Sequence, residues 1–210
     1  MNEKIGALIL AAGSSSRMGR PKQALKYGDT SLLRHAATTA LAAGCSPVIV
    51  VTGANADASR RELEGLSVQE AWNPQWSTGM GSSISVGITA LVDADAGVSA
   101  VVVMLCDQPF VTADVLARLI SAKRTAEDQP SVVASGYGRD FGVPALFSRS
   151  LFAELAKLKG TAGAKAVIAR HTSKAQFISF PEGAVDVDTP EDYVRLISRD
   201  LKQESAGSKR

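Results

Sequence analysis

A short loop near the start of the chain gathers the residue types that hold phosphate groups. It runs from Leu10 to Lys22 and reads LAAGSSSRMGRPK. Its two glycines allow tight turns that expose backbone N–H groups, its serines add hydroxyl donors, and Arg17, Arg20 and Lys22 supply positive charge. We therefore expect the loop to bind a polyphosphate.

The spacing of this loop differs from that of two common phosphate-binding loops. Five residues separate Gly13 from Gly19, and Arg20 follows where a Walker A loop requires lysine and then serine or threonine. The first G-x-G pair of the dinucleotide-binding fingerprint is also absent. A flexible, serine-rich turn with solvated basic residues is the alternative interpretation. A phosphate loop is favoured because the segment follows an apolar run, and ligands of open α/β sheets bind at the carboxyl ends of strands.

An aspartate follows a second apolar run. Residues 100–105 read AVVVML and predict a buried strand, so we expect Asp107 at its carboxyl end, facing the same crevice as the loop. A hard carboxylate oxygen there suits Mg²⁺, which takes few protein ligands and relies on substrate phosphates. A turn or helix-capping residue before Pro109 is the alternative.

A polar segment leads into a predicted helix further along the chain. Residues 73–83 read NPQWSTGMGSS, and the free N–H groups of the helix start could bind an anion or a sugar. The alternative is a capped turn with Trp76 in the core.

Acidic residues also precede the last predicted helix. Residues 186–192 read DVDTPED. Thr189 fits a helix cap and Glu191 a first-turn acid, so neither needs a functional role. Asp186 stays undecided.

These segments need a framework of alternating strands and helices. Apolar runs predict strands at residues 5–10, 48–51, 100–105, 131–134, 143–147 and 176–178. Helical periodicity predicts helices at residues 31–43, 58–66, 81–91, 112–125, 150–158, 162–171 and 190–201. Strands that alternate with helices indicate a mostly parallel sheet, so we expect a three-layer α/β fold of Rossmann-like, glycosyltransferase-A-like type. We further expect one domain over residues 1–202 and a polar, disordered tail over residues 203–210.

Bulk composition narrows the function classes. The 210 residues carry 23 basic and 21 acidic side chains, a net charge of +2, which predicts no nucleic-acid partner and no membrane surface. The apolar stretch at residues 5–12 is too short for a spanning helix and lacks signal-peptide context, so we expect a cytoplasmic protein. Two cysteines and two histidines predict no disulfide framework and no zinc site, and Cys45 and Cys106 are expected to be buried thiols.

The segment LILAAGSSSRMGRPK at residues 8–22 resembles the signature loop of the MobA-like nucleotidyltransferases. Its Ala11-Ala12-Gly13 form is similar to the branch that uses CTP, the molybdenum cofactor cytidylyltransferases, whereas the guanylyl branch usually has glycine at the second position. The resemblance extends from Ile5 to about Leu196. It implies Mg²⁺-dependent transfer of CMP from CTP to molybdopterin, a phosphorylated pterin, with release of pyrophosphate. It leaves a recipient molybdoenzyme open as a further partner.

The resemblance also implies roles for individual residues. The loop would wrap the triphosphate, Arg17 and Lys22 would neutralise it at the transition state, and Ala12 would help to admit a pyrimidine. Asp107 would act in catalysis as a metal ligand, with Asp188 as a second metal contact. The implied nucleotide-binding set comprises Leu10, Ala11, Ala12, Gly13, Ser14, Ser15, Arg17, Gly19, Lys22, Gly79, Met80 and Ser83.

The acceptor side departs from the family pattern. Residues 142–147, GVPALF, resemble the G-x-P-x-x-F stretch of the cytidylyl branch and imply that Gly142 and Pro144 lie on this side. The branch continues with G-D-x-G-A-R, but this chain has Thr161 in place of the acid and Lys165 in place of the arginine. Because lysine cannot reproduce a bidentate guanidinium fork, the identity of the acceptor stays open.

Three alternatives remain open from the sequence. A family member could use GTP, or another phosphorylated or sugar acceptor, in line with the altered residues at 161 and 165. A reductase could reuse the crevice for a nicotinamide dinucleotide, although the G-x-G-x-x-G glycines are missing. A non-catalytic chaperone could hold the cofactor for a molybdoenzyme, and it would release no pyrophosphate.

Overall fold

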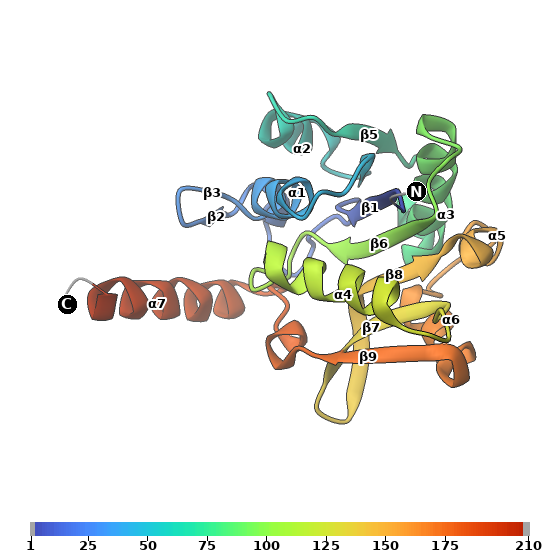
Figure 1. Ribbon diagram of the computed structural model, residues 1–210. Helices are drawn as coiled ribbons and strands as arrows, with labels where there is room; N and C mark the ends of the chain where they lie inside the picture. The colour runs from blue at the N-terminus through green and yellow to red at the C-terminus, as the bar shows by residue number, and fades with distance from the viewer. Residues whose placement is uncertain (1–2, 208–210) are drawn as a thin grey trace.

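A seven-stranded sheet runs through the centre of the computed structural model, which describes residues 3–207, and their side chains as far as residue 199. The strand order is β5-β4-β1-β6-β8-β7-β9 (Figure 1). The strands are β1 (Ile5–Leu10), β4 (Val48–Thr52), β5 (Gln69–Trp72), β6 (Ala100–Leu105), β7 (Val132–Tyr137), β8 (Asp140–Ser148) and β9 (Ala175–Ser179). β8 is antiparallel to both of its neighbours, and the other pairs are parallel. The predicted mostly parallel α/β sheet is therefore confirmed.

The central strands are built from uninterrupted apolar runs. β1 lies between β4 and β6, and all of its residues are buried. A strand that is covered on both faces needs apolar side chains in both directions, which explains why these runs do not alternate with polar residues. The edge strand β5 has a single buried residue, Ala71, so the sequence pattern does not predict it.

Helices cover both faces of the sheet and complete the three layers (Figure 1). One face carries α1 (Leu32–Ala42) and α4 (Ala113–Thr125), and the other carries α3 (Met80–Ala94), α5 (Phe152–Leu155) and α6 (Ala164–Arg170). The short helix α2 (Ala56–Leu63) packs against α1. The last helix, α7 (Pro190–Gly207), projects from the body of the molecule (Figure 1).

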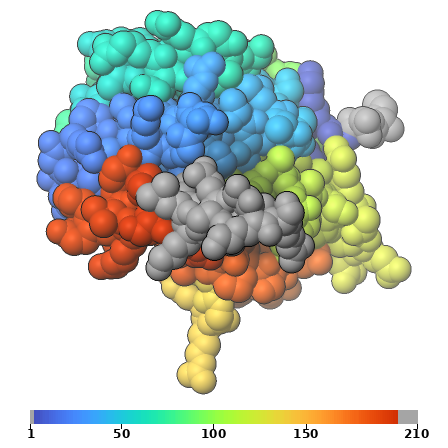
Figure 2. All heavy atoms as spheres, turned by 90° about the vertical axis from the view of Figure 1, so that its left-hand side faces the viewer, coloured from blue at the N-terminus to red at the C-terminus, as the bar shows by residue number. Residues whose placement is uncertain are grey.

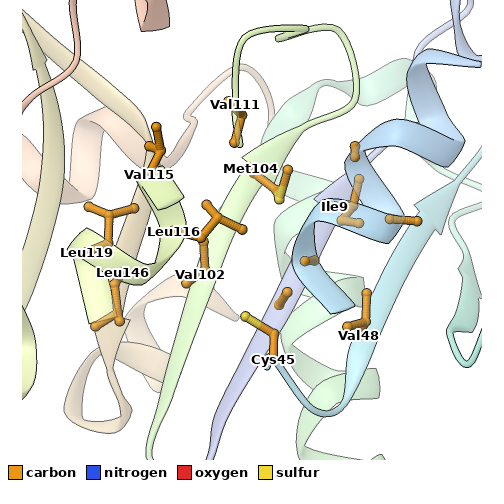
Figure 3. Packing of buried hydrophobic residues seen from close by; sticks show 14 of the residues in the cluster. Ile9, Cys45, Val48, Val102, Met104, Val111, Val115, Leu116, Leu119 and Leu146 are labelled. Carbon is orange, nitrogen blue, oxygen red and sulfur yellow. The ribbon is translucent and has the colours of Figure 1, made fainter. Parts of the chain in front are cut away.

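Apolar side chains fill the space between the sheet and its helices. On one face, Leu116 and Leu119 of α4 pack with Val102 of β6 and Leu146 of β8 (Figure 3). Each such side chain contributes about 1.5–3 kcal/mol when it is fully buried. Cys45 belongs to the same cluster, and both cysteines are free and buried, as predicted.

Several element boundaries differ from the sequence prediction. The helix expected at residues 150–158 is divided into a 3₁₀ turn (Arg149–Leu151) and α5. A short hairpin of β2 (Lys26–Tyr27) and β3 (Thr30–Ser31) was not predicted. The helix expected to end near residue 201 continues to Gly207 as α7, which corrects that boundary. The helix overlaps the polar tail expected from residue 203, and the disorder of that tail stays a prediction. Lys, Gln, Glu and Ala favour helix in this stretch, and residues 208–210 lie outside the described part of the chain.

The C-terminal segment returns to the N-terminal loop. The N–H of Val187 donates to the backbone oxygen of Asp107 over 3.0 Å. Val187 also packs with Met18, Leu25 and residues of α1 and α7 in a small apolar cluster, and Figure 2 shows the blue N-terminal and red C-terminal parts side by side. This contact brings Asp188 to the loop. In the portion of the chain that is described, no helix is both long and apolar enough to cross a membrane.

Candidate active site

Segments that are far apart in the sequence meet at one edge of the sheet. β1 and β6 are parallel neighbours, so the loops after Leu10 and Leu105 begin side by side. β8 starts at the same edge, because Val103 of β6 pairs with Ala145 of β8. With the returning segment at Val187, these loops enclose the crevice that holds most of the predicted site residues.

The loop after β1 turns back on itself and keeps a run of backbone donors available. The N–H groups of Met18 and Gly19 both donate to the carbonyl of Ser15, whose φ of 58° is left-handed. The Ser15 hydroxyl oxygen accepts the N–H of Lys22 over 3.0 Å. Within the described residues, the N–H groups of residues 12–17 have no hydrogen-bond acceptor. Such a run of N–H groups beside cations is an anion-binding concavity.

Lys22 is the centre of the charge network in the crevice. Its ammonium contacts the carboxylate of Asp107 and lies 3.1 Å from Oδ1 of Asp188. The guanidinium of Arg17 donates to Oδ2 of Asp188 over 2.9 Å. Burial alone would lower the pKa of Lys22, but the nearby negative charges, that of Asp107 foremost, hold it above its ordinary value. Lys22 therefore stays a cation at neutral pH.

The two aspartates in this network have the chemistry of metal ligands. One oxygen of Asp107 contacts Lys22, whereas the other, Oδ1, is buried and has no hydrogen-bond partner among the described residues. A buried carboxylate oxygen without a partner is costly, and a divalent cation would satisfy it. The described residues contain no cluster of three or more His, Cys, Asp or Glu side chains suited to a metal. Substrate oxygens and water would therefore complete the coordination, as is usual for Mg²⁺.

A pocket of about 240 Å³ opens between the loop and the start of α3. The predicted site residues on its wall are Leu10, Ala11, Ala12, Gly13, Lys22, Gly79, Met80, Ser83 and Asp107. The other predicted loop residues, Ser14, Ser15, Arg17 and Gly19, do not line it. The predicted nucleotide-binding set thus divides into a part that lines the pocket and a part further along the loop.

Asn73 organises the segment that leads into α3. Its side chain is fully buried, and its Nδ2 donates to the hydroxyls of Ser82 and Ser83 over 2.9 and 3.0 Å. Gly79 has a φ of 123°, and a Cβ there would collide with the carbonyl of Gly160. Trp76 packs against the apolar core, as the capped-turn interpretation expected, and it also lines the pocket.

A second pocket, of about 380 Å³, adjoins the first and shares Leu10, Met80 and Leu105 with it. Gly142 and Lys165, which were predicted to lie on the acceptor side, line this pocket. Pro144 does not: it is buried within β8, where its carbonyl accepts the Ser135 hydroxyl over 2.7 Å. Phe141 and Val143 line the pocket, so the side chain of Pro144 points to the opposite face of β8, whereas Gly142 has no side chain and lines the pocket with its backbone. Thr161 is exposed and does not line the pocket either.

Charged and aromatic groups surround the second pocket. Lys165 lies 2.6 Å from Oδ1 of Asp140 and 5.7 Å from the ring centre of Phe141. Burial raises the pKa of Tyr137 to about 12, and the charges of Asp186 and Asp140 add to that shift. Desolvation by the surrounding walls raises the pKa of Asp186 to about 6, with contributions from the Asp107 and Asp188 charges, although part of its side chain meets solvent. Tyr137 is thus a neutral phenol at neutral pH.

The model of the MobA-like NTP transferase domain matches residues 7–175. This span includes the loop after β1, the start of α3, Asp107 and the whole of β8. The chain belongs to the MobA-like NTP transferase family.

Individual relatives of this MobA-like chain are similar over nearly their whole length. Nicotine blue oxidoreductase from Paenarthrobacter nicotinovorans is 32% identical over 208 residues, covering 92% of this chain and 96% of that protein. Molybdenum cofactor guanylyltransferase from Shewanella halifaxensis is 30% identical over 203 residues, covering 93% and 95%. The crystal structure of Rv0371c from Mycobacterium tuberculosis in complex with manganese has a TM-score of 0.71 and 30% identity, covering 93% of this chain and 98% of that one.

These similarities confirm the family and the fold. The three proteins do not share one named reaction, so family membership alone does not choose the substrates of this chain. The manganese complex shows that a divalent metal is compatible with a protein of this fold.

Two residues of the site of this MobA-like chain were not predicted from the sequence. Gln23 is fully buried and lines the first pocket, although a glutamine after a lysine in a polar segment resembles a surface residue. Asp140 begins β8 after the turn at Gly138, whose φ is 70°. A glycine between two short apolar runs is a hairpin signal, which could have placed Asp140 near the acceptor side.

Proposed function

We propose that this protein transfers CMP from CTP to the phosphate of molybdopterin and releases pyrophosphate, with Mg²⁺ as its metal. The observation that carries the proposal is the meeting of three features in one crevice. A run of available N–H groups lies beside Lys22, and Lys22 lies between the carboxylates of Asp107 and Asp188. Two adjoining pockets flank this point, as a donor nucleotide and a separate acceptor require.

In this proposal, different parts of the loop bind different parts of the nucleotide. Ala12 and Gly13 line the first pocket, which would take the base and sugar. Residues 14–17 lie outside this pocket, on the side where Arg17 pairs with Asp188. Their N–H groups would bind the phosphates. Lys22 reaches both parts, because it lines the pocket and contacts Asp107 and Asp188.

The reaction needs positioning and charge neutralisation more than acid–base chemistry. An acceptor phosphate oxygen attacks the α-phosphorus in line, the new P–O bond forms, and the bond to the β-phosphate breaks to release pyrophosphate. A phosphate monoester has a second pKa of about 6 and is mostly ionised at neutral pH, so no protein base is required. Arg17 and Lys22 would neutralise the charge that develops on the phosphates. Mg²⁺ held by Asp107 and Asp188 would supply further charge stabilisation on the phosphoryl oxygens.

CTP is the proposed donor because of the wall beside Ala12. A Cβ added to the neighbouring Gly53 would lie 2.9 Å from the Ala12 methyl and 2.7 Å from Cβ of Trp76, so the methyl fits into a closely packed wall. Ala12 would narrow the pocket for a purine. GTP is the competing donor, because the Shewanella halifaxensis relative is named a guanylyltransferase.

A flat heterocycle with N–H donors is the acceptor that suits the second pocket. Tyr137 and Phe141 offer aromatic surface, and Asp140 and Asp186 offer carboxylate acceptors. A pterin has both properties. Lys165 would meet the acceptor from the outer side, where it now pairs with Asp140.

Transfer of label tests the proposal. With CTP labelled at the α-phosphate, Mg²⁺ and purified molybdopterin, the label should move to the pterin, and an equal amount of pyrophosphate should appear. Label that stays in CTP under all conditions, with every acceptor supplied, would refute transfer.

An oxidoreductase is the second candidate, because the relative from Paenarthrobacter nicotinovorans is named nicotine blue oxidoreductase. Loss of nicotinamide absorbance in the presence of an oxidised heterocyclic acceptor would favour this candidate. A steady absorbance together with pyrophosphate release would favour the transferase.

A further inference from the structure

Gln23 holds the loop after β1 from the inside of the first pocket. Its fully buried side chain uses Nε2 to donate to the carbonyl of Ala11 over 2.7 Å and to that of Gly13 over 3.0 Å. Its Oε1 accepts the hydroxyl of Ser15 over 3.4 Å. Both protons of the Gln23 amide therefore donate to backbone carbonyls of the pocket wall.

The other carbonyls of this wall are engaged as well. Ala12 accepts the N–H of Ala54 over 3.1 Å, and Gly13 accepts a second bond from Nδ2 of Asn55 over 3.3 Å. The carbonyl of Leu10 accepts the N–H of Cys106 over 3.3 Å. In contrast, the N–H groups of Ala12 and Gly13 have no acceptor in the described part of the chain. This part of the loop thus keeps its N–H donors available and its carbonyl acceptors engaged.

We infer that Gln23 is a specificity-determining residue, because it engages carbonyls of the loop after β1 and leaves this side of the pocket wall with N–H donors that match the acceptor edge of a base. Cytosine presents two adjacent acceptors, N3 and O2, to such a wall. Guanine presents the N1–H and N2–H donors at the corresponding positions, so donors would face donors and both would stay unpaired. Uracil places an N–H between its two carbonyls and is also a poorer match. This inference rests on the proposed use of a nucleoside triphosphate, and it adds the residue that selects the base.

Equilibrium binding of CTP and of GTP, measured by calorimetry with Mg²⁺ and without acceptor, tests this role. Gln23→Met keeps the length of the side chain but releases the carbonyls of Ala11 and Gly13. Wild-type protein should bind CTP more tightly, and the GTP-to-CTP ratio of Kd values should fall about three- to tenfold in the variant, since one hydrogen bond is worth about 0.5–1.5 kcal/mol. Gln129→Met, at the opposite edge of the sheet, is the matched control and should leave the ratio unchanged.

A second variant keeps the test decisive if the buried substitution prevents folding. Asn55→Ala removes one bond to the carbonyl of Gly13 from a partly exposed side chain, and it should shift the ratio in the same direction by about twofold. Equal losses for both triphosphates, with the ratio unchanged in both variants, would mean a purely structural role and would overturn the inference. A wild-type preference for GTP would overturn it too. A shifted ratio without transfer to any acceptor would refute the proposed reaction and leave the role of Gln23 intact.

Discussion

Lys22 and Asp107 form a mostly buried ion pair across the crevice, with side chains 16% and 9% exposed. The two residues follow different strands, β1 and β6, so the pair exists only in the folded chain. Lys22 also contacts Asp188, which means that one ammonium lies between the two proposed metal ligands. A metal that bridges both carboxylates would displace this ammonium, which would then need another anion. A triphosphate supplies that anion, so nucleotide and metal should each favour binding of the other.

Removal of the Lys22 ammonium should strengthen metal binding and at the same time slow catalysis. We expect Lys22→Met to bind Mn²⁺ more tightly than wild type in the absence of nucleotide, because Asp107 and Asp188 lose their competing cation. Turnover should fall about 10²–10³-fold, since a charge contact at the transition state is lost. Metal-free Lys22→Met should also melt at a lower temperature, because a buried carboxylate is left unpaired.

Electron paramagnetic resonance of free Mn²⁺ measures this affinity directly. Lys26→Met is the control, since Lys26 is an exposed cation of the same region with no ion pair among the described residues. Unchanged Mn²⁺ affinity in Lys22→Met would show that the lysine does not compete with the metal.

Asp107→Asn should abolish metal-dependent turnover and leave the fold intact. The substitution keeps the shape of the side chain, but it replaces an anionic ligand, whose Oδ1 has no partner among the described residues, by a neutral amide. Circular dichroism and turnover at a range of Mg²⁺ concentrations check both parts. Asp114→Asn, on the exposed side of α4, should behave as wild type. Wild-type turnover in Asp107→Asn would remove Asp107 from the metal site.

Arg17→Ala should reduce turnover far more than stability. Its side chain is 69% exposed and pairs only with Asp188 among the described residues, so loss of that surface ion pair costs at most about 1 kcal/mol. Loss of a transition-state contact typically costs about 10²–10³ in rate. Steady-state rates and thermal melting measure both effects. Arg20→Ala, which removes another cation of the same loop, is the control. Arg20 lies over the ring of Tyr193 and is expected to be dispensable. A rate loss below about threefold would exclude Arg17 from the mechanism.

Ala12→Gly should weaken a preference for CTP over GTP. The substitution removes a methyl that packs at the pocket wall beside Gly53 and Trp76, and one methyl is worth about 1–3 kcal/mol in selectivity. The ratio of kcat/KM for the two triphosphates measures the effect, and we expect relaxed selectivity without reversal. An unchanged ratio would assign selection to other parts of the wall, such as Gln23 and Asn55.

Local sequence patterns were sufficient to predict the central strands of the sheet. β1, β4 and β6 are buried on both faces, so their apolar runs are visible in the sequence. The edge strand β5 lacks such a run, because solvent covers most of its side chains. The direction of β8 depends on its partners β6 and β7, and no local pattern encodes that choice.

In the site, too, some residues follow from local sequence patterns, whereas others depend on contacts between distant parts of the chain. Residues 10–22 and Asp107 could be found because glycines, cations and a carboxylate follow apolar runs directly. The pairing of Lys22 with Asp188 joins residues distant in sequence, and it depends on the return of the C-terminal segment through Val187. The role of Gln23 depends on burial, which a polar sequence context conceals.

Pyrophosphate release, assayed with each of the four ribonucleoside triphosphates in Mg²⁺, with and without molybdopterin, tests the central claim most directly. The proposed function predicts release that requires both a triphosphate and the acceptor, and that is fastest with CTP. Fastest release with GTP would contradict the cytidylyl assignment but retain nucleotidyl transfer. No acceptor-dependent pyrophosphate with any triphosphate would contradict nucleotidyl transfer to molybdopterin itself.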